Sequence, residues 1–161
     1  MDGMQLTAQQ DFAAQPSQVA AMLIDRVFLE RVCVASEAEK HSVTVDGAHT
    51  AVSRTLPAPS SVTKFTGSTV TILEDLVWSE AAADGSRTAR FSLKVQGLPV
   101  EMLGTARLAP GGRGTRVDYS GDLTVNIPFV GKKLEQSAAP AVLDGIGLQQ
   151  RVGDDWLAGT S

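Results

Sequence analysis

The chain has 161 residues, of which 43% are hydrophobic and 20% charged, and its formal net charge is −4. This length predicts one domain over residues 1–161, and the composition excludes a disordered chain. The acidic balance argues against nucleic acid as a partner, because phosphate binding needs a clustered basic surface. No stretch approaches the roughly 18 apolar residues that span a bilayer, so stable membrane insertion is not expected.

The N-terminal segment and the single cysteine each allow one prediction. Residues 1–10 have neither a basic nor an apolar segment. We therefore predict no signal peptide and expect a cytoplasmic protein. Cys33 excludes an internal disulfide, and its apolar neighbours indicate a buried structural thiol instead of a reactive one.

The first part of the chain predicts a strand followed by two short helices. Residues 4–12 alternate between two faces, as a half-buried strand does. Pro16 and Ser17 break this strand. Helical spacing then covers residues 17–25 and, in a second short helix, about 27–35.

From residue 39 onward the hydrophobic period changes to two, which predicts an antiparallel sheet built from hairpins. Glycine, proline and aspartate gather between the segments, as is typical of turns. The predicted strands cover about 39–46, about 49–56, 68–80, 87–95, 100–108 and 115–127.

The last segment predicts one long helix, because its apolar residues form a single stripe on a helical wheel. The stripe comprises Leu134, Ala138, Ala141, Val142, Gly145, Leu148, Val152 and Trp156. Pro140 removes a backbone donor and is expected to kink or split the helix. Gly145 and Gly147 each weaken it by about 1 kcal/mol relative to alanine.

Together these elements predict an α+β fold: a curved, seven-stranded antiparallel sheet, two short helices after its first strand, and a long C-terminal helix packed across it. Several motifs fit this layout. They are Arg54-Thr55-Leu56-Pro57, Lys64-Phe65, Trp78 at a strand end, the run from Ile127 to Glu135, and Gln150-Arg151-Val152-Gly153 before Trp156.

The order of elements and these motifs resemble the helix-grip fold of the START-like superfamily, also called SRPBCC. That group includes the birch-pollen allergen, polyketide cyclases and lipid-transfer domains. Within it, the chain looks like an uncharacterised actinobacterial family. The resemblance covers nearly the whole chain. It implies a hydrophobic cavity between sheet and last helix, but no particular activity, because this fold hosts many.

Such a cavity would suit a small hydrophobic or amphipathic partner, such as a lipid, a sterol or a polyketide-like molecule. Small side chains on the last helix would face bulkier ones on the sheet, which leaves either a space or a tight backbone approach. The residues predicted to line the cavity are Arg54, Glu74, Phe91, Leu93, Met102, Tyr119, Leu123, Ala138, Ala141, Val142 and Gly145. Close packing without a cavity is the alternative.

Four side chains have alternative interpretations. Arg54 and Glu74 share faces with apolar residues, where a charge is costly unless paired. They would form a pair that orients a polar ligand group or a purely structural pair, or one of them would reach solvent from an edge strand. Tyr119, the only tyrosine, would bond a ligand oxygen or be a satisfied core residue. Phe65, in the loop 57–67, would be a lid over the cavity or a core anchor.

No catalytic residue, metal site or cofactor is assigned. His41 and His49 flank a predicted hairpin and could lie close together, but two histidines without a dependable carboxylate make a poor zinc site. The chain has no Gly-x-Ser-x-Gly motif, and the glycine-rich run 111–114 has no helix after it.

Three functions stay open at this point. The preferred one is binding or transport of a hydrophobic small molecule, because no catalytic set is found. The second is a cyclase or dehydratase acting on an aromatic polyketide, with Arg54, Glu74 and Tyr119 as its polar groups. The third is an interaction module in which Leu143 and Ile146 dock a partner or a second copy. A monomer or weak homodimer is expected.

Overall fold

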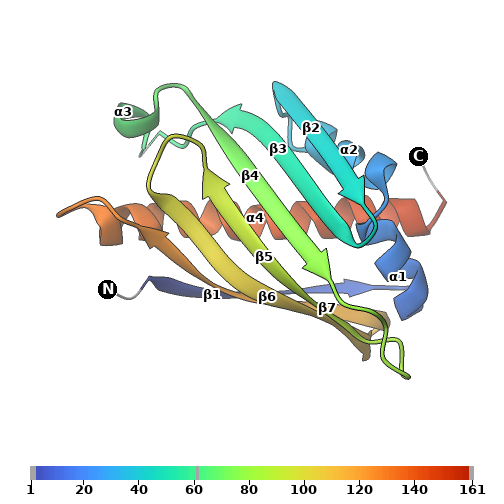
Figure 1. The fold of residues 1–161 in the computed structure, drawn as a ribbon. Coiled ribbons are helices and arrows are strands. Elements are labelled where there is room, and N and C mark those ends of the chain that lie inside the picture. Colours follow the sequence, from blue (N-terminus) through green and yellow to red (C-terminus); the bar gives the residue numbers. More distant parts are fainter. Residues whose placement is uncertain (1–2, 61, 160–161) are drawn as a thin grey trace.

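The computed structural model describes residues 3–60 and 62–159. It has the predicted α+β fold, with one antiparallel sheet and a long helix running behind it (Figure 1). The elements are β1 (Met4–Phe12), α1 (Pro16–Leu23), α2 (Arg26–Ala35), β2 (Lys40–Asp46), β3 (His49–Pro57), α3 (Thr63–Thr66), β4 (Thr69–Trp78), β5 (Arg87–Val95), β6 (Val100–Gly111), β7 (Gly114–Val125) and α4 (Gly131–Leu157).

The seven strands form one sheet in the order β1-β7-β6-β5-β4-β3-β2, and every neighbouring pair is antiparallel. β1 pairs with β7 from Met4 opposite Leu123 to Phe12 opposite Thr115. The chain then crosses through α1 and α2 to the other edge and returns by consecutive hairpins. β1 and β2 are therefore the two edges of the sheet.

The boundary between α1 and α2 differs from the prediction for a clear physical reason. Asp25 does not belong to the first helix, because its carboxylate accepts hydrogen bonds from the backbone N–H groups of Val27 and Phe28, at 2.8 and 3.2 Å. Asp25 is thus the N-cap of α2. α1 begins one residue earlier than predicted, since Pro16 suits the first turn of a helix.

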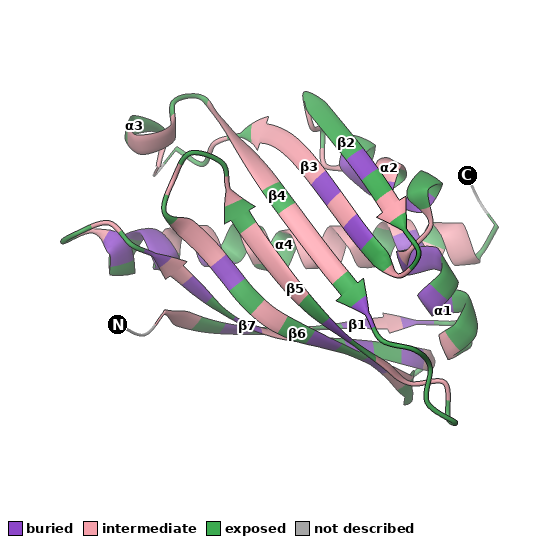
Figure 2. Ribbon diagram, in the orientation of Figure 1, coloured by how far each residue is buried: buried purple, intermediate pink, exposed green. Residues whose placement is uncertain are grey.

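The buried residues form two clusters. The larger lies where α1, α2 and the C-terminal half of α4 meet the sheet, and Phe12, Phe28 and Leu108 are fully buried there. The smaller cluster is built around Met102 and Leu123. Between them, Figure 2 shows long intermediate stretches on β3, β4 and β5. The inner face of these strands is therefore only partly covered.

Of the two outcomes expected at Pro140, a kink or a split, the split does not occur, because α4 runs as one helix from Gly131 to Leu157. The carbonyl that loses its intrahelical partner is that of Gln136, four residues earlier. Both Pro140 and Gln136 are exposed. Because water can satisfy that carbonyl on the solvent side, the helix continues through the proline.

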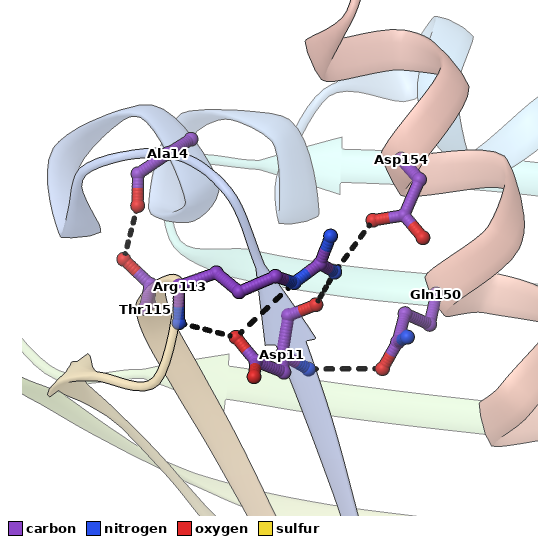
Figure 3. Close-up of polar contacts among 6 residues, drawn as sticks. All are labelled: Asp11, Ala14, Arg113, Thr115, Gln150 and Asp154. Atoms are coloured by element: carbon purple, nitrogen blue, oxygen red, sulfur yellow. Dashed lines mark hydrogen bonds and ion pairs between the residues drawn. The ribbon is translucent and has the colours of Figure 1, made fainter.

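The C-terminal half of α4 is fastened to the sheet by polar contacts around Arg113, in the β6–β7 turn (Figure 3). The backbone N–H of Arg113 donates to the Asp11 carboxylate at 3.0 Å, and its guanidinium reaches Asp154 of α4 at 3.2 Å. Gln150, also on α4, accepts from the backbone N–H of Asp11 at 2.9 Å. The helix is thus held to β1 and to the β6–β7 turn.

Within the described ranges, no helix has the length and apolar character needed to cross a bilayer.

Candidate ligand-binding cavity

A cavity of about 590 Å³ lies between the inner face of the sheet and α4. One wall comes from β3, β4 and β5, and the opposite wall from α4 between Leu134 and Arg151. α4 packs mainly against β1, β7 and α2. Because β3 to β5 receive little cover from the helix, the half-buried apolar side chains on these strands face the open volume.

Small residues on α4 keep this volume free. Ala138, Ala141 and Gly145 all line the cavity. A Cβ atom added at Gly145 would find no heavy atom within 4 Å. The helix therefore stands clear of the sheet at this point.

The structure places every residue predicted to line the cavity around this one volume. They are Arg54, Glu74, Phe91, Leu93, Met102, Tyr119, Leu123, Ala138, Ala141, Val142 and Gly145. Other lining residues were not assigned to the site, among them Leu29, Val32 and Cys33 of α2 and Pro59 and Val62 before α3. The apolar spacing of α2 could not show that Leu29, Val32 and Cys33 face the cavity, because their direction depends on how α2 packs against β2 and α4.

The charged group on the sheet side of the wall is the ion pair between Arg54 and Glu74. Arg54 lies opposite Ile72 and Glu74 opposite Val52, so the two charged residues are diagonal neighbours on adjacent strands. The Arg54 guanidinium contacts the Glu74 carboxylate through Nη2 and Oε1. Their side chains are 12% and 24% exposed. Part of each side chain is therefore accessible to a molecule in the cavity.

Tyr119 is hydrogen-bonded on both sides of its hydroxyl. The hydroxyl donates to Gln10 Oε1 at 2.9 Å and accepts from Gln149 Nε2 at 3.3 Å. Gln10 in turn donates to the backbone carbonyl of Ile146 at 2.9 Å. Burial raises the pKa of Tyr119, so the phenol stays protonated. This network joins β1, β7 and α4 and closes one side of the cavity.

Phe65 lines the cavity from α3, a one-turn helix within the segment predicted as a loop. Its ring is half-buried, and the Lys64 ammonium lies 5.3 Å from the ring centroid. A second, smaller pocket shares Phe65 and Thr66 and reaches the β5–β6 turn at Leu98. Both pockets therefore meet at this end of the sheet.

Leu143 and Ile146, which were expected together on the exposed side of α4, differ in their surroundings. Leu143 is 40% exposed. Ile146 instead lines the cavity. One turn of α4 thus presents these two side chains to different surroundings.

The two histidines are also far apart. His41 lies opposite Arg54 and His49 opposite Asp46, at the two ends of the β2–β3 ladder. The five intervening steps correspond to roughly 17 Å. His49 instead contacts Asp75 at 2.6 Å. Among the described residues, His, Cys, Asp and Glu nowhere gather in a group of three that could hold a metal ion.

The buried thiol of Cys33 should make the free energy of unfolding depend on pH. Burial raises its pKa from 9.0 to about 11, against the opposing effect of Arg54. As the pH rises, the thiol loses its proton at a lower pH in the unfolded chain than in the folded protein. The thiol's contribution to stability is therefore complete below pH 9 and is lost as the pH rises toward 11, by at most about 1.4 kcal/mol per pH unit. We expect the unfolding free energy to fall more steeply in this window than in Cys33→Ala.

Alkylation of Cys33 by iodoacetamide at pH 8 should be slow in the folded protein and fast in urea, because the thiolate is the reactive form. A rate in the folded protein equal to that of a free thiol would contradict this assignment.

Comparison with known proteins gives one family and a common fold. A family model described as "Protein of unknown function (DUF2505)" matches residues 7–157. No curated protein matches the chain. Among solved structures, TTHA0849 from Thermus thermophilus is 24% identical, with a TM-score of 0.65 over 98% of this chain and 100% of that one.

Two further structures share the fold at lower identity. A STAR-related lipid transfer protein fragment from Xanthomonas axonopodis is 16% identical, with a TM-score of 0.63 over 96% of this chain and 85% of that one. Ginseng major latex-like protein 151 from Panax ginseng is 12% identical, with a TM-score of 0.57 over 96% and 97%. The START-like fold predicted from the motifs is confirmed, while the narrower actinobacterial grouping stays a prediction.

Proposed function

The chain belongs to the DUF2505 family of proteins of unknown function, and we propose that it binds a small hydrophobic or amphipathic molecule in the cavity beneath α4. The observation that carries this proposal is the volume of about 590 Å³ between α4 and β3 to β5. Ligand pockets commonly enclose 300–1,000 Å³ behind mainly apolar walls with a few polar groups. The fold shared with a STAR-related lipid transfer protein supports the same class of ligand.

The chemical character of the cavity wall favours a molecule with an apolar body and one polar group. Most lining side chains are aliphatic or aromatic, and the Arg54–Glu74 pair interrupts them from the β3–β4 side. A ligand hydroxyl, carbonyl or carboxylate placed there would gain a hydrogen bond to a charged group. Lipids, sterols and polyketide-like molecules all meet this description.

Titration with a fluorescent fatty-acid analogue, followed by competition with sterols and aromatic polyketides, tests the proposal. We expect saturable binding of one probe per chain and displacement by at least one class. Absence of binding across all three classes by a folded sample would contradict it.

Replacement of Arg54 separates a ligand role from a structural one. Arg54→Met leaves the Glu74 carboxylate unpaired in the wall, so we expect reduced stability. The double variant Arg54→Met/Glu74→Gln removes both charges and should recover folding. In that double variant, the affinity for ligands with a polar group should fall by about tenfold or more. The affinity for a purely apolar ligand should stay the same.

Binding by calorimetry or probe displacement gives the two affinities, and urea unfolding gives the stability. If the double variant binds both kinds of ligand like the wild type, the ion pair is structural only.

A further inference from the structure

Phe129, in the connection between β7 and α4, is the most exposed large hydrophobic residue of the described chain. Its side chain is 106% exposed, whereas the other exposed large hydrophobic residues range from 39% to 66%. Its backbone φ of 71° lies in the left-handed region that side chains other than asparagine and glycine rarely adopt. Phe129 thus combines an unfavourable exposure of its ring to water with an unfavourable backbone conformation.

The conformation belongs to a well-defined turn. The backbone N–H of Gly131 donates to the carbonyl of Ile127 at 2.9 Å, which closes the turn around Phe129. A Cβ atom at position 131 would lie 2.3 Å from the carbonyl oxygen of Val125, so this close approach requires glycine. Asn126 donates to the carbonyl of Pro99 at 2.9 Å and ties the turn to the β5–β6 connection. The ring is thus presented outward by fixed neighbours.

The end of the molecule that carries Phe129 is also the end where the cavity meets the second pocket. We call this the mouth end and define it by residues 57–60, 62–68, 94–101 and 126–135. Figure 1 shows these three connections on one side of the molecule. Phe65, Leu98 and Ile127, one from each connection, line the cavity. An apolar surface placed here would therefore lie beside residues that line the cavity.

The charge of the mouth end is opposite to that of the whole chain. It contains four lysines, Lys64, Lys94, Lys132 and Lys133, and only two acids, Glu101 and Glu135. Glu101 pairs with Lys94 at 3.5 Å. Glu135 is buried, and its carboxylate accepts from the backbone N–H of Val125 at 2.9 Å. Within these ranges basic residues therefore outnumber acidic ones, in a protein with a net charge of −4.

We propose that the mouth end docks reversibly on the surface of an anionic lipid bilayer, with Phe129 inserted among the headgroups. Aromatic rings favour the membrane–water interface, and basic side chains beside them add attraction to anionic lipids. An acidic protein partner would complement the lysines. A lipid surface, however, also explains an aromatic ring held out on a fixed turn beside residues that line an apolar cavity.

Flotation with vesicles of phosphatidylcholine, with and without phosphatidylglycerol, tests the docking. The wild type should bind the vesicles that contain phosphatidylglycerol, and the bound fraction should fall as salt is raised. Phe129→Asn should weaken this binding by about tenfold or more. Asparagine tolerates the left-handed backbone, so the fold should be retained. Phe129→Trp should bind like the wild type and shift its added fluorescence to shorter wavelengths on vesicles.

Leu103→Asn is the matched control, because Leu103 is 51% exposed on β6. It loses an apolar side chain outside the mouth end and should leave vesicle binding unchanged. Binding of a soluble probe in the cavity, measured without vesicles, should be the same in Phe129→Asn and wild type. Failure of docking is thus distinguishable from failure of the proposed ligand binding.

Three results would overturn the docking proposal. The first is a wild type that ignores both kinds of vesicle. The second is a Phe129→Asn variant that binds anionic vesicles as well as the wild type does. The third is a wild type that forms dimers dependent on Phe129 and does not bind vesicles, which would assign the surface to a second copy of the chain.

Discussion

A Gly145→Trp variant should fold normally and lose ligand binding. The cavity wall has open space at this position, since no heavy atom lies within 4 Å of an added Cβ. An indole there would extend into the volume of about 590 Å³ from the side of α4. Because the ring would replace the ligand as the apolar filling, we expect affinity for the fluorescent fatty-acid analogue to drop by at least about tenfold. Thermal unfolding should show no loss of stability.

Gly147→Trp is the control for this experiment. Gly147 lies on the same helix, does not line the cavity, and has the flexible Arg151 side chain as its nearest neighbour, at 3.7 Å. Its tryptophan should therefore leave probe affinity unchanged. If both variants bind like the wild type, the volume beneath Gly145 is not where the ligand lies.

Gly153→Val should destabilise the fold by about 1–3 kcal/mol. An added Cβ at Gly153 would lie 2.6 Å from the Phe12 ring and 3.1 Å from the Met22 methyl group. Both of these side chains are almost fully buried, so neither can move without opening the larger core cluster. The helix would instead have to lift off β1 and α1. Urea unfolding measures the change in the free energy of unfolding.

Gly145→Ala is the comparison within the same helix. It adds a methyl group into open space and removes the helix cost of glycine, so it should stabilise the protein by about 0.5–1 kcal/mol. Equal changes in the free energy of unfolding at positions 145 and 153 would contradict the placement of α4. In the structure, Gly145 borders open space, whereas Gly153 packs against Phe12 and Met22.

These two glycines show where sequence patterns stop being informative. Both fall in a helical segment that the apolar stripe predicts well. Local pattern does not distinguish a glycine that leaves a cavity from one that allows a close approach. The difference depends on the angle at which α4 crosses the sheet. That angle is set by distant contacts such as those of Arg113 with Asp11 and Asp154.

The strands were the most predictable part of the fold. Their period-two pattern places Arg54 and Glu74 on the cavity side of β3 and β4, as the structure has them. The pattern could not show that the two residues are diagonal neighbours, because the register between strands depends on the intervening turns and on α3. Whether the two side chains contact each other was therefore open until the register was known.

Polar groups inside the fold were the hardest to assign from the sequence. Gln10 shares the buried face of β1, but its partners, Tyr119 and the carbonyl of Ile146, lie more than a hundred residues away. Glu135 looks like an ordinary surface glutamate near the start of α4, yet it is buried and accepts a hydrogen bond from the backbone N–H of Val125 at the end of β7. Such roles arise only when distant segments meet.

Native mass spectrometry of the purified protein, followed by organic extraction of any bound molecule, tests ligand binding beneath α4 most directly. We expect one small apolar or amphipathic molecule per chain in the wild type. That molecule should appear in the extract and be absent from Gly145→Trp. A wild type that carries nothing and takes up no fatty acid, sterol or polyketide when these are supplied would contradict the proposal that the space beneath α4 is a binding site.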